Sequence, residues 1–266
     1  MVSIVIPTYN RNDFLSSCLD ALFFENLVTP DEFEVIVSDD SVNNIAKELI
    51  EQNYPLVKWV AGPKKGPAAN RNNGAKNATG EWLLFLDDDC LPQKEWLSFY
   101  INAIKSSEND LVFEGCTRPD RRKLRFDEEA PINLTGNNLW SCNFAINAAF
   151  FAQLNGFDEA FPFAAMEDVD FHKRVSEKTH IIFLPKALVI HPWRRIKPFG
   201  TFKKHLKSHQ FFANKHKTKG FKYRLHRTKI FAKRMVYDFN RLSQFSFRGW
   251  QFYVEKCALN FCLIFI

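Results

Sequence analysis

Short apolar runs alternate with helical patterns over the first hundred residues of the chain. Four segments are rich in apolar side chains, at residues 2–7, 33–38, 56–61 and 82–87. Helical patterns separate or follow them, at residues 13–24, 44–52 and 67–78 and from near Gln93 onward. Strands that alternate with helices in this way predict βαβ units, in which helices cover both faces of a mostly parallel sheet. We therefore predict an α/β, Rossmann-like fold for this part.

The pattern changes in the middle of the chain. Residues 118–138 are polar and charged, contain two prolines and show no sustained period. Such a segment is typical either of a solvated surface loop or of a mobile loop over an active site, and the sequence leaves both open. Apolar structure resumes at residues 139–157, and residues 180–191 read as a strand that closes this part of the chain.

The last part of the chain predicts a basic amphipathic helix at residues 221–242. Its apolar stripe follows three- and four-residue spacings and consists of Leu225, Thr228, Phe231, Met235, Phe239 and Leu242. Basic residues occupy positions between them, namely Lys229, Lys233, Arg234 and Arg241. The final apolar stretch, residues 257–266, is shorter than the roughly 20 residues that a membrane span needs, so any membrane attachment is expected to be peripheral.

The charge distribution separates the chain into an acidic body and a basic arm. Residues 1–193 carry 18 Lys and Arg against 28 Asp and Glu, whereas residues 194–266 carry 18 against 2. We predict a catalytic domain at residues 1–195 and a basic helical arm at residues 196–266. A basic arm with interspersed aromatic residues suits an anionic membrane surface, but nucleic acid and the protein's own acidic body are alternative partners.

Cysteines and the N-terminus indicate a cytoplasmic protein. The six cysteines are scattered without a C-x-x-C pair, which favours neither a disulfide framework nor a zinc site. The N-terminal residues lack a basic region and a cleavage site, and they read as a strand. Nothing in the sequence specifies an oligomeric state.

Carboxylates gather where predicted strands end, in the groups Asp39/Asp40, Asp87/Asp88/Asp89, Glu167/Asp168 and Asp170. In open α/β sheets ligands bind beside the carboxyl ends of strands. Adjacent like charges are costly to hold together, and we expect a divalent cation and a phosphate ligand to compensate them. The alternative is a set of solvated aspartates that cap the next helix. No P-loop and no G-x-G-x-x-G motif occurs.

Five motifs carry a resemblance to a known family. "SIVIPTYNR", "VIVSDDS", "GPAANRNNGAKNATGEWLLFLDDDCLP", "NFAINAAFFAQLNGFDEAF" and "EDVDFHKRV" follow one another along the chain. Their order and spacing resemble those of the family 2 glycosyltransferases with the GT-A fold, over residues 2–193. The resemblance implies an inverting, Mn²⁺- or Mg²⁺-dependent transfer of a sugar from a nucleotide-sugar donor, with UDP favoured, to a glycan or lipid-linked acceptor. It also implies bacterial surface polysaccharide or lipopolysaccharide synthesis as the setting, at the inner face of the cell membrane.

The resemblance also implies roles for individual residues. Pro7, Tyr9 and Arg11 would line the nucleotide, and Asp39 would accept a hydrogen bond from the base. Arg71 would lie near the base or diphosphate, and Asp87 beside the ribose. Asp89 would hold the metal with His191 near it, Asp168 would be the general base, and Asp88, at the variable middle position, is assigned no direct role.

Simpler interpretations stand beside several of these roles. His191 could be a strand-end histidine satisfied by the backbone, and Asp40 a helix cap. Asp170 is expected only to pair with Lys173 or Arg174. Trp140 and Trp193 are expected to be core aromatics and not sugar platforms.

Two other functions compete with a glycosyltransferase. A sugar-nucleotide pyrophosphorylase would need a Gly-rich, Arg-containing loop after the first strand, which "PTYNRNDF" does not provide. A nucleic-acid-binding protein would use the basic arm, but it leaves the carboxylate groups unexplained. We therefore expect no nucleic-acid partner.

Overall fold

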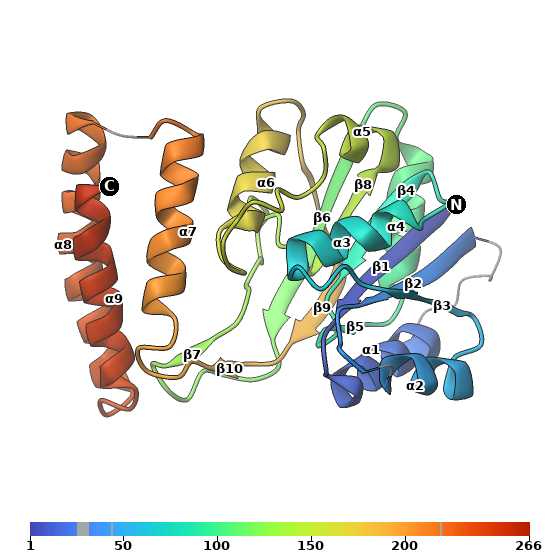
Figure 1. Cartoon of the computed structure of the whole chain (residues 1–266), viewed down its shortest axis with the longest axis horizontal. Coiled ribbons are helices and arrows are strands. Elements are labelled where there is room, and N and C mark those ends of the chain that lie inside the picture. Colours follow the sequence, from blue (N-terminus) through green and yellow to red (C-terminus); the bar gives the residue numbers. More distant parts are fainter. Residues whose placement is uncertain (26–31, 44, 219) are drawn as a thin grey trace. The chain divides into compact units, whose positions relative to one another are not determined.

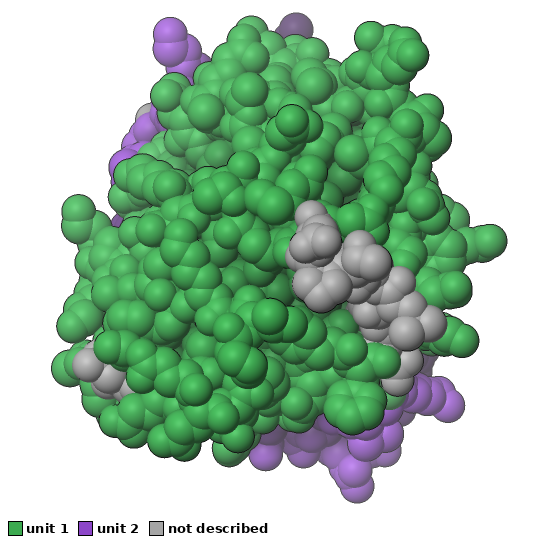
Figure 2. Space-filling model, turned by 90° about the vertical axis from the view of Figure 1, so that its right-hand side faces the viewer, with its two compact units in different colours: residues 1–120, 131–159, 167–192 green, residues 121–130, 160–166, 193–266 purple. Residues whose placement is uncertain are grey.

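The protein forms two compact units. The computed structural model describes residues 1–25, 32–43, 45–218 and 220–266. Unit 1 contains residues 1–120, 131–159 and 167–192, and unit 2 contains residues 121–130, 160–166 and 193–266 (Figure 2). Unit 2 thus joins the predicted arm to two short segments from the middle of the chain.

Unit 1 is built on an eight-stranded mixed sheet (Figure 1). In spatial order the strands are β3 (Val57–Ala61), β2 (Phe33–Asp39), β1 (Val2–Thr8), β4 (Trp82–Leu86), β8 (Asn143–Asn147), β6 (Val112–Pro119), β9 (Ile182–His191) and β5 (Leu91–Pro92). The first four are parallel to one another, β8 is antiparallel to both of its neighbours, β6 and β9 are parallel, and β5 is antiparallel to β9. The prediction of an α/β, mostly parallel sheet is confirmed.

Six helices of the described chain belong to unit 1. They are α1 (Asn12–Glu25), α2 (Ile45–Asn53), α3 (Pro67–Lys76), α4 (Trp96–Ser106), α5 (Ala148–Gln153) and α6 (Glu167–Ser176). The predicted strands and helices of the first hundred residues are present within a few residues of their expected bounds. The helix expected from near Gln93 begins at Trp96, because the short strand β5 comes first. Strand β6, which lies in the middle of the sheet, had no counterpart in the sequence analysis.

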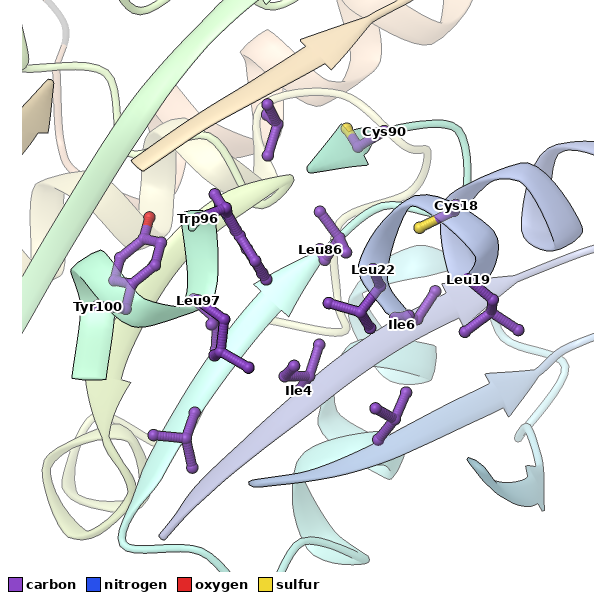
Figure 3. Packing of buried hydrophobic residues seen from close by; sticks show 14 of the residues in the cluster. Ile4, Ile6, Cys18, Leu19, Leu22, Leu86, Cys90, Trp96, Leu97 and Tyr100 are labelled. Atoms are coloured by element: carbon purple, nitrogen blue, oxygen red, sulfur yellow. The ribbon is translucent and has the colours of Figure 1, made fainter. Parts of the chain in front are cut away.

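Alternating side chains of the strands build a core on each face of the sheet. On one face Ile4 and Ile6 of β1 and Leu86 of β4 pack with α1 and α4 (Figure 3). On the other face Val5 and Phe85 join a cluster of buried rings. That cluster contains Phe144, Phe151, Phe157 and Phe171. Because both faces are covered, the strand ends are held in fixed positions relative to one another.

Unit 2 consists mainly of α7 (Phe202–Lys215), α8 (Phe221–Gln244) and α9 (Trp250–Cys262), with a 3₁₀ turn η2 (Leu263–Phe265). A two-stranded ribbon pairs β7 (Glu128–Glu129) with β10 (Arg194–Arg195), so part of the predicted middle loop is a strand. The predicted amphipathic helix is confirmed as α8. Among the residues that the structure describes, no helix combines the length and apolar character that a membrane crossing requires.

The apolar stripe predicted for α8 is divided between two faces. Phe231 stacks edge-on against Phe261 of α9, with ring centroids 5.9 Å apart, and Leu242 is buried. Leu225, Met235 and Phe239 are instead 48%, 41% and 48% exposed. Phe239 nevertheless contacts the rings of Phe247 and Tyr253, whereas Leu225 and Met235 are apolar side chains that the helix leaves exposed.

Candidate functional site

The carboxyl ends of β1, β2 and β4 place the predicted polar residues along one edge of the sheet. Thr8 at the end of β1 is paired in register with Asp39 at the end of β2. Asp87 follows the last residue of β4, and the backbone N–H of Cys90 donates to the carbonyl of Asp87, at 3.1 Å. This turn puts Asp88 and Asp89 at its centre, which explains how three consecutive carboxylates can point in different directions.

Two arginines supply positive charge to the Asp87–Asp89 triplet. Nη2 of Arg71 lies 2.6 Å from Oδ1 of Asp87. Arg11 contacts the other two carboxylates, with Nη2 2.8 Å from Asp88 Oδ1 and Nη1 3.1 Å from Asp89 Oδ2. The fold thus supplies two cations to the triplet by itself, beside the divalent cation that the sequence analysis predicts.

Asp88 is fully buried and takes part in the site. The hydroxyl of Thr8 donates to its Oδ2 at 2.7 Å, beside the ion pair with Arg11. Burial raises the pKa of Asp88 to about 7, although Arg11 and Thr8 act in the opposite direction. The resemblance implied no direct role for Asp88. In the structure Asp88 contacts Arg11 and so helps to position it.

Asp89 and His191 are brought together by strand pairing. β5 follows the triplet and pairs with β9 so that Leu91 lies opposite Ile190, the neighbour of His191. Nε2 of His191 is 3.3 Å from Oδ1 of Asp89, and both side chains are almost completely buried. The Sγ atom of Cys90 lies within 4.8 Å of both groups. Burial and the adjacent Cys142 raise the pKa of the Cys90 thiol well above its ordinary value, so the thiol remains neutral.

The tautomer of His191 suits a cation beside Asp89. Its Nδ1 is 2.7 Å from the backbone carbonyl of Pro192. Since a carbonyl only accepts hydrogen bonds, Nδ1 carries a proton, and a lone pair on Nε2 would repel the Asp89 carboxylate 3.3 Å away. A second proton or a metal ion between the two groups removes this repulsion. One nitrogen and one carboxylate oxygen are donors that Mn²⁺ accepts, so the residues present fit the implied metal.

Arg71 links the triplet to the first turn of α6. It lies in the middle of α3 and is 5% exposed, and its guanidinium carbon lies over the ring of Phe157, 5.7 Å from the centroid. Burial acts against its charge, but the carboxylates of Asp87, Asp168 and Glu167 raise its pKa above the ordinary value. Its Nε and Nη1 atoms are buried and donate to no acceptor among the described residues. Two donors of a buried guanidinium thus remain available to a ligand.

The first turn of α6 carries two carboxyl groups with raised pKa values. Burial raises the pKa of Glu167 to about 7, with a further contribution from Asp168. Burial also raises the pKa of Asp168, whereas Arg71 and hydrogen bonds from Ser141 lower it. Oδ1 of Asp168 is buried and accepts no hydrogen bond from the described residues. A carboxylate oxygen of this kind can accept a proton from a substrate hydroxyl.

The remaining predicted nucleotide residues lie at the ends of β1 and β2. Pro7 is buried within β1, whereas Tyr9 is 56% exposed. Both carboxylate oxygens of Asp39 accept internal hydrogen bonds, from the backbone N–H of Ser41 at 2.9 Å and from Trp59 Nε1 at 3.3 Å. Contact of these residues with a base remains a prediction.

Several simpler interpretations receive a definite answer. Asp170 is fully buried, and its Oδ2 accepts from Nε of Arg174 at 2.8 Å, which confirms the expected helical ion pair. Asp40 accepts from the backbone N–H groups of Lys64 and Gly66 at 2.8 and 3.0 Å. The interpretation of Asp40 as a helix cap is therefore wrong, because the side chain holds the loop ahead of α3, whose N-cap is Gly66. Trp140 packs partly buried against the core of unit 1, as expected.

Three features of the site were not found from the sequence. They are the bridge from Arg11 to Asp88 and Asp89, the protonatable Glu167 and the contact of Ser141 with Asp168. Each depends on residues far apart in the chain. Only the acidic pair "ED" gave a sequence signal, and it pointed to Asp168 alone.

Comparisons with known proteins found similarity to glycosyltransferases. A family model described as glycosyl transferase family 2 matches residues 3–166. A poly(ribitol-phosphate) beta-glucosyltransferase from Bacillus spizizenii is 33% identical over 116 residues, which cover 42% of this chain and 18% of the relative. A GalNAc(5)-diNAcBac-PP-undecaprenol beta-1,3-glucosyltransferase from Campylobacter jejuni is 29% identical over 123 residues, covering 43% and 38%. The chain thus spans well under two thirds of the length of these relatives.

A solved structure supports the fold. The mannosyltransferase PcManGT from Pyrobaculum calidifontis, determined with GDP-Man and Mn²⁺, superimposes with a TM-score of 0.59 at 20% identity. The likeness covers 83% of this chain and 65% of that one. It shows a common fold.

Proposed function

The chain belongs to glycosyl transferase family 2, and from this we propose that it is an inverting, metal-dependent glycosyltransferase that uses a nucleoside diphosphate sugar. The observation that carries the proposal is the cluster at the edge of the sheet. It joins Asp87 with Arg71, Asp89 with His191, and Asp168 with the same Arg71. We retain residues 1–195 as the proposed catalytic domain and residues 196–266 as the proposed arm.

The donor site uses the groups that can recognise a diphosphate. Asp89 and His191 would hold Mn²⁺ or Mg²⁺, which would supply positive charge to stabilise a departing nucleoside diphosphate. Arg71 offers two buried N–H groups to the same region. Pro7, Tyr9, Arg11, Asp39 and Asp87 form the proposed surroundings of the nucleotide. UDP-sugars are the first candidates, and the GDP-Man of the Pyrobaculum mannosyltransferase makes GDP-sugars the second.

Asp168 is the proposed general base. An inverting transfer requires removal of the acceptor proton on the face opposite the leaving group. The buried Oδ1 of Asp168 has no hydrogen-bond donor among the described residues, and Ser141 holds the carboxyl group in place. Burial raises the pKa of Asp168, and the positive charge of Arg71 lowers it. Arg71 therefore favours the ionised carboxylate that a general base needs.

We propose a glycan or lipid-linked glycan as the acceptor, in bacterial surface polysaccharide synthesis. The name of the Campylobacter relative specifies an undecaprenol-linked substrate, and such an acceptor is confined to a membrane. Unit 2 offers a surface that suits this setting. The exposed apolar side chains of α8 recur at helical spacing, with Phe221 81%, Leu225 48%, Val236 60% and Phe239 48% exposed.

Basic residues accompany this exposed stripe of α8. Lys222, Lys229 and Lys233 are all exposed on the neighbouring face of the helix. Apolar side chains with flanking lysines bind the interface of an anionic bilayer, through burial of the first and charge attraction of the second. We therefore propose peripheral attachment at the inner face of the cell membrane.

A donor screen tests the enzymatic proposal. The purified protein is incubated with UDP-, GDP- and dTDP-sugars and Mn²⁺, and release of the nucleoside diphosphate is measured with and without EDTA. One donor class should be hydrolysed slowly in the presence of metal. Binding of DNA or RNA without cleavage of any donor would contradict the proposal and favour the nucleic-acid alternative. Formation of a nucleotide sugar from a sugar phosphate would favour a pyrophosphorylase.

A further inference from the structure

Arg11 contacts two carboxylates, Asp88 and Asp89, that have different proposed roles. It directly precedes α1 and contacts Asp88 at 2.8 Å and Asp89 at 3.1 Å. The two aspartate side chains are 0% and 2% exposed, whereas that of Arg11 is 37% exposed. Arg11 is therefore the solvent-exposed member of both ion pairs.

The contact with Asp89 conflicts with the proposed metal site. A guanidinium keeps its charge at all working pH values, so it cannot make room for a cation by losing a proton. Arg11 contacts Oδ2 of Asp89, whereas His191 lies at Oδ1. Two cations on one carboxylate repel each other, so the contact with Arg11 weakens metal binding at Asp89, and a bound metal favours withdrawal of Arg11 from that side chain. Asp88, which also accepts from Thr8, can retain Arg11 during this change.

Arg71, the second arginine of the cluster, is buried and held by its contacts. Arg71 is paired with Asp87 at 2.6 Å, and its side chain is only 6% exposed and stacked on Phe157. It is therefore a fixed charge of the site. Arg11, in contrast, contacts Asp89 and is exposed to solvent.

We propose that Arg11 is a built-in competitor of the metal at Asp89, and that the donor diphosphate relieves the competition by accepting the guanidinium. This inference rests on the proposed function and specifies how its two ligands influence each other. Arginine binds phosphate through paired N–H groups, so the diphosphate is a suitable new partner. The metal then binds weakly alone and tightly with the nucleotide, and by reciprocity the nucleotide binds more tightly with the metal.

The test measures Mn²⁺ binding directly. Free Mn²⁺ is titrated by electron paramagnetic resonance, with and without UDP and GDP, in the full chain and in Arg11→Gln. Loss of hydrogen bonds to a charged group should lower the Kd for Mn²⁺ alone by on the order of tenfold to a hundredfold. The increase in Mn²⁺ affinity caused by nucleotide should be smaller in Arg11→Gln than in the wild type. An unchanged Kd, or an equal nucleotide effect, would overturn the inference.

Three further variants separate the possible causes. Lys94→Gln removes one positive charge from an exposed site of the same unit and should leave the Kd unchanged; a similar gain there would show a general charge effect and overturn the inference. Arg11→Lys keeps the charge but cannot bridge two carboxylates, and an intermediate Kd is expected. If Arg11→Gln does not fold, Arg11→Lys is the variant that tests the proposal. A wild-type Kd in Arg11→Lys would overturn the role of the bridge.

Asp89→Asn distinguishes this inference from the proposed function. If Asp89→Asn loses Mn²⁺ binding while Arg11→Gln matches the wild type, the competition is wrong and the metal site stands. If Asp89→Asn binds Mn²⁺ as the wild type does, both fail. Thermal unfolding gives a second measurement, because Arg11→Gln leaves Asp88 and Asp89 without their shared cation. Excess Mn²⁺ should raise its unfolding temperature more than that of the wild type, and an equal rise would contradict the inference.

Discussion

Replacement of Arg71 with methionine should destabilise unit 1 strongly and in a pH-dependent manner. The guanidinium is 5% exposed and lies 2.6 Å from Asp87, so solvent screens this pair little. Methionine keeps much of the volume but leaves the carboxylate without its cation. Removal of one member of a buried ion pair costs about 3–5 kcal/mol. For a protein of this size the unfolding temperature should fall by roughly 10 °C.

The pH dependence follows from Glu167. Burial raises its pKa from 4.5 to about 7 in the folded protein. A carboxyl group with a raised pKa contributes stability that is fully present below its unfolded pKa and is lost as the pH rises through the folded value. At about 1.4 kcal/mol for each pKa unit, roughly 3 kcal/mol is lost between pH 4.5 and 7. Without Arg71, which lowers this pKa, the folded value rises and the loss extends to higher pH.

The cost of Arg71→Met should therefore be larger at pH 8 than at pH 5. At pH 5 Glu167 is protonated in both proteins, and fewer carboxylates remain without a cation. Differential scanning calorimetry at the two pH values measures the difference. Adding Glu167→Gln to Arg71→Met removes one of these carboxylates and should recover part of the loss at pH 8 only. A fall in unfolding temperature of the same size at both pH values would refute the electrostatic reasoning, and a negligible fall would refute the importance of the pair.

Three other perturbations test the remaining assignments. Asp89→Asn should abolish Mn²⁺-dependent donor binding in calorimetry without unfolding the protein, and unchanged donor affinity would argue against a metal at this residue. Asp168→Asn should lower turnover by about 10²–10⁴-fold with donor binding nearly unchanged, and a product that retains the donor's anomeric configuration in NMR spectra would exclude an inverting base. Leu225→Glu should reduce sedimentation with anionic vesicles, whereas Leu56→Glu, at an exposed site of unit 1, should not; equal binding by both variants, or binding of the wild type to neutral vesicles, would refute the membrane surface of α8.

The sequence alone determined most elements of the first hundred residues, the helix α8 and the identity of most candidate residues. Apolar runs such as residues 82–86 alternate with helices, and this alternation indicates an α/β sheet. The apolar residues of α8 repeat at helical spacing within one segment. These are local signals, because the side-chain periods of strands and helices repeat within a few residues. The position of carboxylates directly after strands is equally local, and it was enough to locate the edge of the sheet at which Asp39 and Asp87 lie.

Only the tertiary structure decided which charges meet. Arg11 reaches Asp88 and Asp89 across 77 and 78 positions of sequence, because β1 and β4 are neighbours in the sheet. His191 reaches Asp89 because β9 pairs with β5. The sequence shows that three adjacent carboxylates need cations, but it does not show which distant arginines will contact them in the fold. That choice depends on strand order and on burial, which weakens solvent screening and so makes each charge depend on its neighbours.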